Sequence, residues 1–404
     1  MFGVSKPKII VDEKKIDEVL TRGVEEVVDG EQLRKKLKSG KQLRIKLGID
    51  PTSPNIHIGR TIPLLKLRDF QNLGHKIVLI IGDFTGLIGD TSDKDSERPM
   101  LPEEVIKENL RNYVKQAEKV IDMKKCEIHY NSEWLGKLNY YEIGRQADIF
   151  SLSDFISREN IKKRLDDGKR VSLRELMYPL MQGYDSVAIK SDVELGGTDQ
   201  RFNLLAGRDL QRSYGQKPQD ILTNPLIEGL DGRKMSSSWG NVINLFDSPN
   251  DMYGKVMSLK DELIVKYFTL TTRLEIEKIE EYKKDLESGE NPKNIKMKLA
   301  KEIVKMYHGE KSAEEAEKSF EDTFSKGEFP NNAQIIIAKK GDKLVDVFTK
   351  NKIVESKSEF RRLLEAGAIS DYPDKKINDP NEVVGEDERK IKTGKKTFVI
   401  LRPE

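Results

Sequence analysis

The amino-acid sequence predicts an α/β fold with a doubly wound parallel sheet, followed by an all-helical region and a small mixed α/β module. Three observations lead to this expectation. Short apolar strands alternate with helices over residues 1–247, helical periodicity with few strand signals fills 248–332, and a lysine-rich α/β pattern fills 333–404. A chain of 404 residues can also hold several domains of about 100–200 residues each.

The first β-α-β unit shows the alternation most clearly. Residues 13–40 are highly charged and predict a helical start. A strand is predicted over 43–50, where apolar and basic residues alternate, and a more apolar strand over 76–81. A helix is predicted between them, over 58–73. This unit favours a parallel sheet with a right-handed crossover.

The remaining elements continue the pattern. Three further strands are expected near 127–130, 192–195 and 220–223, with helices between them at 102–121, 172–190 and 199–214. Helices without intervening strands are expected at 249–257, 261–270, 274–287, 291–308 and 312–325. A linker is expected at 327–332, before a C-terminal module with a capped helix that begins at 356 and a strand over 397–401.

Composition narrows the class of protein. Hydrophobic residues make up 36% of the chain and charged residues 35%, but the net charge is only +2, so any nucleic-acid contact must be local. The single cysteine excludes an intrachain disulfide and a cysteine-rich zinc site, and the four histidines lack metal-ligand spacing. No apolar stretch approaches the ~20 residues of a membrane helix, and no signal-peptide core is present. We expect a soluble, cytoplasmic protein without zinc.

A candidate phosphate site follows the first strand. That strand ends at Gly48 and Asp50, and the next turn delivers His57, Gly59 and Arg60 to the start of a helix. Ligands bind beyond the carboxyl ends of the strands in open α/β sheets, and a helix N-terminus attracts anions. Glycine allows close approach of a ligand, and an arginine fork suits phosphate. Taken alone, the segment could equally be an ordinary strand-turn-helix with an incidental histidine.

A second candidate is the polar loop 232–238, which contains Lys234, Ser236, Ser237 and Ser238. A mobile loop with a lysine and hydroxyl groups can close over a polyphosphate and stabilise charge in a transition state. Taken alone, it could also be a solvated surface loop. In order and separation, however, His-Ile-Gly-Arg and Lys-Met-Ser-Ser-Ser together resemble the two signature motifs of class I aminoacyl-tRNA synthetases, HIGH and KMSKS.

A third element points to the amino acid. Tyr178, Gln182 and Asp185 are spaced i, i+4, i+7 and share one helix face between apolar residues, which is typical of a polar pocket with apolar walls or of a partly exposed polar face. Together with the segments 82–90 and 194–200, this face resembles the tyrosyl-tRNA synthetase family, in its bacterial form with the Lys-Met-Ser motif. The resemblance covers essentially the whole chain and implies a Rossmann-like catalytic domain at 1–247.

The resemblance also implies roles for individual residues. Asp90, Tyr178 and Gln182 would hold the α-amino group of tyrosine, Asp185 its hydroxyl group and Gln200 its carboxyl region. The residues that would bind ATP and the adenylate are Gly48, Asp50, Gly59, Gly197, Asp199 and Lys234. The residues that would act on the phosphates and the leaving pyrophosphate are Thr52, His57, Lys94, Arg98, Lys234 and Ser238, and the charge of Arg60, although this residue departs from the motif, makes it a further catalytic candidate.

Three positions depart from the better-known members of the family. Arg60 replaces the second histidine of HIGH, and Ser237 replaces the second lysine of KMSKS. Lys46 stands where many relatives carry a tyrosine that contacts the substrate hydroxyl group, which leaves Asp185 alone or aided by another donor such as Asn131. Because losing a preorganised donor costs about 3–4 kcal/mol, we hypothesise that Arg60, with the cations at 94 and 98, supplies the charge that Ser237 lacks.

The resemblance extends to cofactors, partners and the C-terminal module. It implies ATP with Mg²⁺, L-tyrosine and tRNA(Tyr) as ligands, and a homodimer formed through a connective segment at about 100–180. The helical region 248–332 resembles the anticodon-side domain, and 333–404 resembles the RNA-binding module first known from ribosomal small-subunit protein four. The cations that would contact RNA there are Lys357, Arg361, Arg362, Lys395 and Lys396. A solvated charged face is the alternative for these cations.

Three other functions fit part of the sequence. A tryptophanyl-tRNA synthetase would share the catalytic fold and the serine-rich loop, but the face of Tyr178, Gln182 and Asp185 and the C-terminal module favour tyrosine. A non-catalytic RNA-binding paralogue would explain Arg60 and Ser237 alone. A small nucleotidylyltransferase uses a similar histidine turn, but it would need neither the helical region nor the C-terminal module.

Overall fold

The structure is a computed structural model that describes residues 8–92, 100–324, 329, 333–373, 375–394 and 397–404. It divides into two compact units, Met1–Gly309 and Glu310–Glu404, which are described separately below. No described helix combines the length and the apolar content needed to cross a bilayer.

The first unit is built on a six-stranded sheet with the order β1-β6-β5-β2-β3-β4. Its strands are β1 (Glu26–Val28), β2 (Arg44–Ile49), β3 (Lys76–Ile81), β4 (Glu127–Tyr130), β5 (Val193–Gly197) and β6 (Asp220–Asn224). All neighbouring strands are parallel except the edge strand β1, which pairs antiparallel with β6. The apolar side chains of β3 are buried because helices cover both faces, as in other parallel sheets. The predicted fold class is confirmed.

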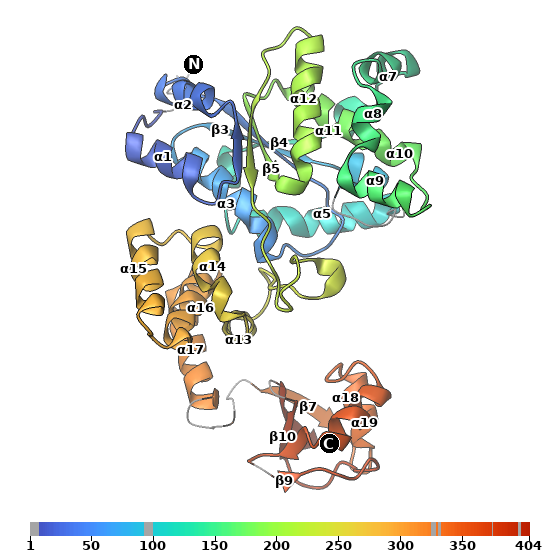
Figure 1. Ribbon diagram of the computed structural model, residues 1–404. Coiled ribbons are helices and arrows are strands. Elements are labelled where there is room, and N and C mark those ends of the chain that lie inside the picture. Colours follow the sequence, from blue (N-terminus) through green and yellow to red (C-terminus); the bar gives the residue numbers. More distant parts are fainter. Residues whose placement is uncertain (1–7, 93–99, 325–328, 330–332, 374, 395–396) are drawn as a thin grey trace, which may run out of the picture. The chain divides into compact units, whose positions relative to one another are not determined.

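Helices pack on the two faces of this sheet (Figure 1). Helix α3 (Ile58–Asn72) connects β2 to β3, and α12 (Arg201–Ser213) connects β5 to β6 on the opposite side, beside α11 (Tyr178–Ile189). Helices α11 and α12 approach closely because Gly183 lacks a side chain: a Cβ atom there would lie 2.7 Å from Leu210 Cδ1. The connective segment between β3 and α11 contains α4 (Thr85–Ile88), α5 (Glu103–Ala117), α6 (Ser132–Leu135), α7 (Tyr140–Ala147), α8 (Leu152–Ile156), α9 (Glu159–Asp166) and α10 (Leu173–Leu176).

Two predicted helices of this unit are wrong as continuous elements. The segment 13–40 forms α1 (Glu13–Thr21) and α2 (Gly30–Lys38) with strand β1 between them, because Gly23 turns the chain with a φ of 59° and two valines then pair with β6. The segment 172–190 divides at Met177 into α10 and α11, since Pro179 falls at the start of the second helix, where the missing N–H is tolerated.

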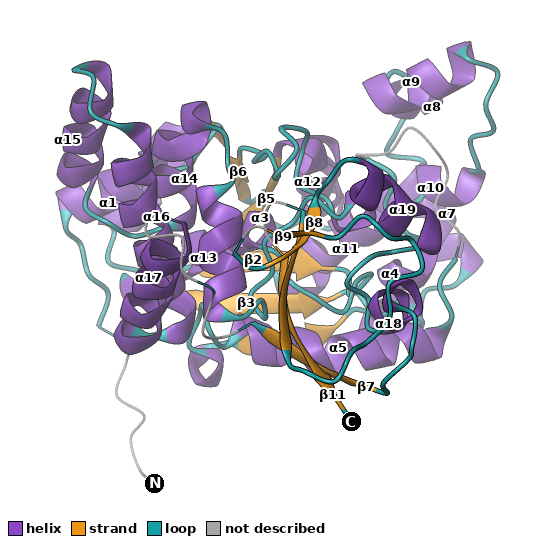
Figure 2. Ribbon diagram, turned by 90° about the horizontal axis from the view of Figure 1, so that it is seen from below, coloured by secondary structure: helices purple, strands orange, loops and turns teal. Residues whose placement is uncertain are grey.

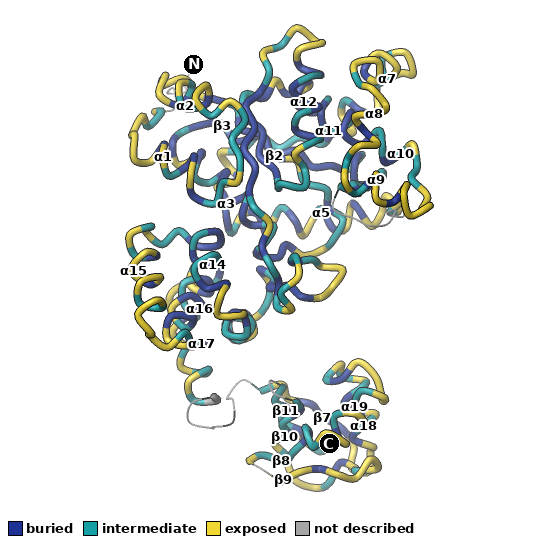
Figure 3. The backbone as a smooth tube through the Cα atoms, viewed as in Figure 1, coloured by how far each residue is buried: buried dark blue, intermediate teal, exposed yellow. Residues whose placement is uncertain are grey.

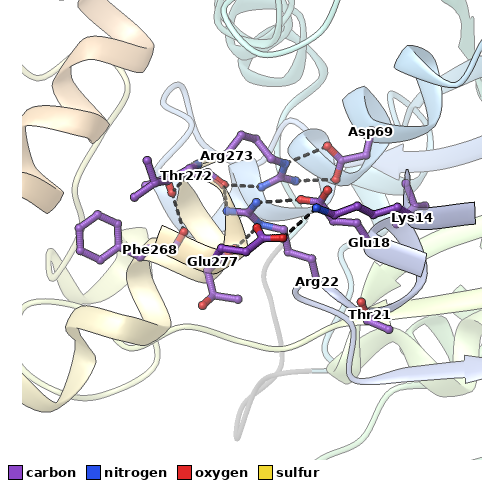
Figure 4. A network of polar contacts seen from close by, with 12 residues as sticks. Lys14, Glu18, Thr21, Arg22, Asp69, Phe268, Thr272, Arg273 and Glu277 are labelled. Carbon is purple, nitrogen blue, oxygen red and sulfur yellow. Dashed lines mark hydrogen bonds and ion pairs between the residues drawn. The ribbon is translucent and has the colours of Figure 1, made fainter. Parts of the chain in front are cut away.

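Residues 249–308 form the helices α13 (Pro249–Met257), α14 (Ile264–Thr271), α15 (Ile276–Glu287) and α16 (Pro292–His308), and no described residue of this segment is in a strand (Figure 2). A polar network joins it to the sheet domain (Figure 4). Arg22 donates to the carbonyls of Thr269 and Thr272, and Arg273 forms a two-pronged ion pair with Asp69 of α3. The helices therefore belong to the same compact unit as the sheet.

The second unit contains α17 (Glu310–Phe324) and a small α/β module. Its five-stranded sheet has the order β7-β11-β10-β8-β9. The elements are β7 (Gln334–Ala338), α18 (Leu344–Lys350), α19 (Lys357–Glu365), β8 (Ile369–Asp371), β9 (Lys375–Lys376), β10 (Arg389–Thr393) and β11 (Thr397–Pro403). Phe348 and Phe360 pack edge to face in its core. Ser356 caps α19 by accepting from the backbone of Glu359. The linker predicted at 327–332 lies, except for Phe329, outside the described residues.

Candidate active site

A cleft of 820 Å³ opens where β2 and β5 end, between the start of α3 and the loop 234–238. This is the edge of a parallel sheet at which ligands are expected. The predicted site residues that line the cleft are Gly48, Asp50, Thr52, His57, Gly59, Arg60, Asp90, Asn131, Tyr178, Gln182, Asp185, Gly197, Asp199, Gln200, Lys234 and Ser238. Lys94 and Arg98 lie outside the described residues. The fold thus brings together residues from distant segments in one cavity.

Asp185 lies at the deep end of the cleft and is only 3% exposed. Its carboxylate accepts two hydrogen bonds, from Trp134 Nε1 at 2.8 Å and from Asn131 Nδ2 at 3.3 Å. Burial raises the pKa of Asp185 to about 7, although Lys46 and the two hydrogen bonds oppose this rise. The Asn131 contact that the sequence suggested is present, and Trp134, three residues later, is a partner that sequence reasoning missed.

Four amide and carboxylate side chains form a connected network above the sheet. Asn203 on α12 donates to Gln182 Oε1 at 3.0 Å and to Gln200 Oε1 at 3.1 Å, and Gln200 donates in turn to Asp90. Three of the four residues expected around the amino and carboxyl groups of tyrosine, Asp90, Gln182 and Gln200, are therefore linked in one network that includes Asn203. Asn203 was not among the predicted site residues, although its spacing of three residues from Gln200 would place both on one helix face.

Asp50 joins the middle of the cleft to the end of β2. Its two carboxylate oxygens accept from the hydroxyl groups of Tyr178, at 2.8 Å, and of Thr85, at 2.7 Å. Gly82 leaves room for this carboxylate, because a Cβ atom there would lie 1.9 Å from Asp50 Oδ1. Burial, and then Asp50 itself, raise the pKa of Tyr178 well above its ordinary value, so its hydroxyl group is a neutral donor.

The start of α3 carries two buried nitrogen atoms that lack a hydrogen-bond partner, His57 Nδ1 and Arg60 Nη1. Burial, with the nearby charges of Arg60 and Lys234, lowers the pKa of His57 to about 3, so the imidazole is neutral. Within the described ranges, no carboxylate lies within ion-pair distance of Arg60. An anion at this helix N-terminus would find an unsatisfied N–H of Arg60, a second N–H from His57 in the tautomer that is protonated at Nδ1, and no competing negative partner.

The loop after β6 is held in a defined shape by Asn241, a buried residue that the sequence did not single out. Its side-chain amide donates to Asp231 at 2.7 Å and to the carbonyl of Lys234 at 3.1 Å, and its oxygen accepts from the backbone of Ser236 at 2.8 Å. Lys234 forms an ion pair of 3.0 Å with Asp199 across the cleft. The loop therefore presents a lysine and three serines toward the α3 N-terminus.

The Lys46 side chain does not line the cleft, and it is fully buried. Its Nζ atom lies 2.8 Å from Glu194 Oε1, beneath helix α11. It therefore cannot replace a tyrosine that contacts the substrate hydroxyl group directly, and Trp134 and Asn131 are the side chains that donate to Asp185.

The C-terminal cations lie in the second unit, on the exposed side of α19. Lys357, Arg361 and Arg362 are all exposed, and Lys357 pairs with Asp346 at 2.6 Å. Lys395 and Lys396 lie outside the described residues. Across the described parts of both units, no group of three or more histidine, cysteine or acidic side chains is placed to hold a metal ion.

Comparisons with known proteins identify the family of the chain. The family model described as "tRNA synthetases class I (W and Y)" matches residues 38–325. The chain is 44% identical over 384 residues to a tyrosine–tRNA ligase of Thermotoga maritima, covering 94% of this chain and 95% of that protein. It is 43% identical over 400 residues to tyrosine–tRNA ligase 2 of Clostridium acetobutylicum, covering 97% and 100%.

Solved structures share the fold. The tyrosyl-tRNA synthetase of Archaeoglobus fulgidus, solved with L-tyrosine, matches with a TM-score of 0.61 at 24% identity and covers 75% of this chain and 99% of its own. A truncated mitochondrial tyrosyl-tRNA synthetase of Aspergillus nidulans matches with a TM-score of 0.65 at 20% identity, over 78% and 95% of the two chains. From the matched family model and from relatives that align over nearly their whole length, the chain belongs to the tyrosyl-tRNA synthetase family.

Proposed function

We propose that this chain is a tyrosine–tRNA ligase. It activates L-tyrosine with ATP, forming tyrosyl-adenylate and releasing pyrophosphate, and then transfers tyrosine to the 3′-terminal adenosine of tRNA(Tyr). The observation that carries the proposal is one cleft with two chemically different ends. Asp185 with its two donors occupies one end, and the unpaired nitrogens of His57 and Arg60 occupy the other.

The Asp185 end fits the side chain of tyrosine. The carboxylate accepts the phenolic O–H, and Asp90, Tyr178 and Gln182 surround the α-amino group, while Gln200 lies near the carboxyl group. A site built around a hydrogen bond to a hydroxyl group rejects the analogue that lacks it, because its buried polar groups would then stay unpaired. This reasoning favours tyrosine over phenylalanine and over tryptophan.

The other end fits ATP. Gly48, Gly59 and Gly197 leave room for the nucleotide, and Asp50 and Asp199 supply acceptors for its polar edges. A carboxylate oxygen of tyrosine attacks the α-phosphorus atom in line, the bond to the β-phosphate oxygen breaks, and pyrophosphate leaves. No protein nucleophile is required, so the rate comes from positioning and from charge stabilisation.

The groups that stabilise this charge surround the phosphates. We assign Thr52, neutral His57, Arg60, Lys234 and Ser238 to this role, and Lys94 and Arg98 to the leaving pyrophosphate. Mg²⁺ would enter the site bound to the phosphates of ATP, as in most nucleotide sites, and would neutralise part of their charge. In the second half-reaction, a ribose hydroxyl of the terminal adenosine attacks the carbonyl carbon of the adenylate, and AMP leaves.

Partners and domain roles complete the proposal. Large apolar side chains are exposed along the connective segment, including Tyr140 at 94%, Tyr141 at 76% and Leu173 at 76%. Much of the backbone of α7 is coloured as exposed in Figure 3. Such residues favour a homodimer formed through about 100–180, which light scattering after gel filtration would detect as twice the chain mass. We assign 248–332 to the anticodon side of the tRNA and 333–404 to RNA binding, in a cytoplasmic enzyme.

The decisive experiment is ATP–pyrophosphate exchange without tRNA, run separately with tyrosine, phenylalanine and tryptophan. We expect exchange with tyrosine alone, followed by charging of tRNA(Tyr) when tRNA is added. Exchange with tryptophan instead would move the assignment to tryptophan. A folded protein that exchanges none of the three would contradict the proposal and favour a non-catalytic RNA-binding role.

A further inference from the structure

A buried ion pair lies beneath the end of the cleft that contains Asp185. Lys46 on β2 and Glu194 on β5 are directly opposite in the strand register, and both are 0% exposed. Their charged atoms are 2.8 Å apart. The pair belongs neither to the wall of the cleft nor to the roles assigned above, so its presence in the core needs its own explanation.

Every hydrogen-bonding direction of the lysine is used. Lys46 Nζ also donates to the backbone carbonyl of Gln182 at 2.9 Å and to Ser186 Oγ at 2.7 Å, both on helix α11. Glu194 in turn accepts from Ser186 Oγ at 2.9 Å and from the side chain of Gln219. These hydrogen bonds therefore hold the turn of α11 between Gln182 and Ser186 against the sheet, and Asp185 lies on this turn.

The surrounding glycine shows that the space is shaped for this network. A Cβ atom at Gly207 on α12 would lie 2.8 Å from Gln219 Nε2 and 3.4 Å from Glu194 Oε2. Replacing a buried ion pair by apolar residues of similar volume is often neutral or stabilising for a fold. Stability alone therefore does not explain a fully desolvated lysine and glutamate at this place.

The charges that face Asp185 give the pair a second effect. Burial raises the pKa of Asp185, and the positive charge of Lys46 is the largest of the influences that lower it again. The hydrogen bonds from Trp134 and Asn131 lower it further, and Glu194 raises it by the smallest amount of the five. The buried hydroxyl group of Tyr178 is neutral and carries no charge toward Asp185.

We propose that Lys46 is a positioning residue for tyrosine specificity, which acts through helix α11 and its own positive charge to keep Asp185 as the carboxylate that accepts the substrate hydroxyl group. This inference rests on the proposed tyrosine-activating function. Lys46 is fully buried and does not line the cleft, so it acts on specificity indirectly, from beneath the helix.

The test compares three chains in ATP–pyrophosphate exchange between about pH 6 and pH 9. The first is wild type, the second Lys46→Met, and the third the double variant Lys46→Met with Glu194→Gln, which removes both charges. A rise of one unit in the pKa of Asp185 corresponds to about a tenfold loss of its ionised form below that pKa. For Lys46→Met we expect about a tenfold higher KM for tyrosine near neutral pH. The acid limb of the pH profile, which is the range in which activity falls as the pH is lowered, should move to higher pH.

The double variant and phenylalanine separate this role from simple support of the fold. The acid limb of the double variant should lie between those of wild type and Lys46→Met, because the opposing charge of Glu194 is gone. Activation of phenylalanine should fall much less than that of tyrosine in both variants, because phenylalanine has no hydroxyl group to present. A general disturbance of the pocket would lower the activation of tyrosine and of phenylalanine by the same factor, and it would leave the pH profile unchanged.

Lys66 provides a matched control, because it is another buried lysine, 1% exposed, which donates to the carbonyls of Val19 and Arg22 and does not line the cleft. Lys66→Met should lower thermal stability and leave the KM profile for tyrosine unchanged. Circular dichroism checks that the Lys46 variants are folded. The proposal is overturned if either folded variant shows the wild-type pH profile and loses activation of tyrosine and of phenylalanine by the same factor. A wild-type protein without tyrosine-dependent exchange would instead refute the function itself.

Discussion

The two ends of the cleft differ in how completely their polar groups are paired. Around Asp185, two donors hold the carboxylate, and the ion pair of Lys46 and Glu194 beneath it has all its lysine protons satisfied. At the start of α3, in contrast, His57 Nδ1 and Arg60 Nη1 are buried without a partner. One end is assembled before a ligand arrives, while the other leaves donors that the ligand must satisfy.

This difference matches what each end must do. Discrimination between amino acids requires a rigid acceptor, since a loosely held carboxylate would tolerate the loss of the hydroxyl group. Charge stabilisation requires donors that are matched to the transition state rather than to the resting protein. The comparison predicts different kinetic signatures: changes at the α3 end should act on kcat, and changes at the Asp185 end should act on the selection of tyrosine.

The largest effect is expected from Arg60→Ala. Removing one preorganised donor from a transition state typically lowers kcat by about 10²–10³-fold, and we expect a loss of this size in pyrophosphate exchange with a smaller change in KM for tyrosine. Arg212→Ala, which removes an exposed arginine paired with Asp209 on α12, is the control and should leave exchange unchanged. Wild-type kcat in Arg60→Ala would show that the unpaired nitrogen serves no phosphate.

A second substitution sharpens the assignment of Arg60. If Arg60 supplies the charge that Ser237 lacks, then Ser237→Lys should restore part of the kcat lost in Arg60→Ala, while it should add little to the wild-type chain. Single-turnover measurement of adenylate formation would separate this effect from product release. Equal gains in both backgrounds would mean that the two positions act independently.

The next effect concerns the paired end. Asp185→Asn replaces the acceptor carboxylate by an amide of the same shape, and losing a hydrogen bond to a charged group costs about 1.5–3 kcal/mol. We expect kcat/KM for tyrosine to fall by about 100-fold, and kcat/KM for phenylalanine to fall far less. Asp209→Asn on the exposed face of α12 is the control. If kcat/KM fell by the same factor for tyrosine and for phenylalanine, the residue that contacts the substrate hydroxyl group would lie elsewhere.

The sequence supplied candidate residues for both ends of the cleft, but it missed some of the side chains that pair with them. Parallel strands end at the same edge, so Gly48, Asp50, Gly197 and Asp199 could be placed together from their positions alone. Trp134 and Asn203 were missed because their contacts depend on side-chain orientations between distant segments. The pairing of Lys46 with Glu194 across the sheet, which buries the lysine completely, could not be predicted from the sequence because the two residues lie on strands that are distant in the chain.

The edge strand of the sheet also depends on a contact between distant segments, which local sequence does not predict. Strand β1 has only three residues, and it exists because Val27 and Val28 find β6, a partner far along the chain. Local charge around this segment favoured a helix. By contrast, β3, a continuous apolar run, and α13, which begins at Pro249 after a capping serine, were predicted with the bounds that the structure has.

A smaller effect follows from the pKa of Asp185, which is raised from 3.8 to about 7. The group accepts the hydroxyl group when ionised, so KM for tyrosine should be constant above this pKa and should rise as the pH falls below it, by about tenfold per unit. His57 does not contribute to this limb, because its pKa is lowered to about 3. The limb should therefore persist in His57→Gln and vanish in Asp185→Asn, and the opposite pattern would assign it to the phosphate end.

The smallest effect is expected from the loop that faces the α3 end. Asn241→Ala removes the amide that connects Asp231, the Lys234 carbonyl and the Ser236 backbone. A hydrogen bond between neutral groups contributes about 1 kcal/mol and one to a charged carboxylate such as Asp231 about 1.5–3 kcal/mol. These bonds shape the loop, and the loop keeps the ion pair of Lys234 with Asp199, so we expect about a fivefold lower kcat with KM for tyrosine unchanged. The loop acts on the phosphates, so Asn241→Ala should not alter the selection of tyrosine over phenylalanine. A change in that selection would show that the two ends of the cleft are coupled and would contradict the assignment of kcat to one end and substrate selection to the other.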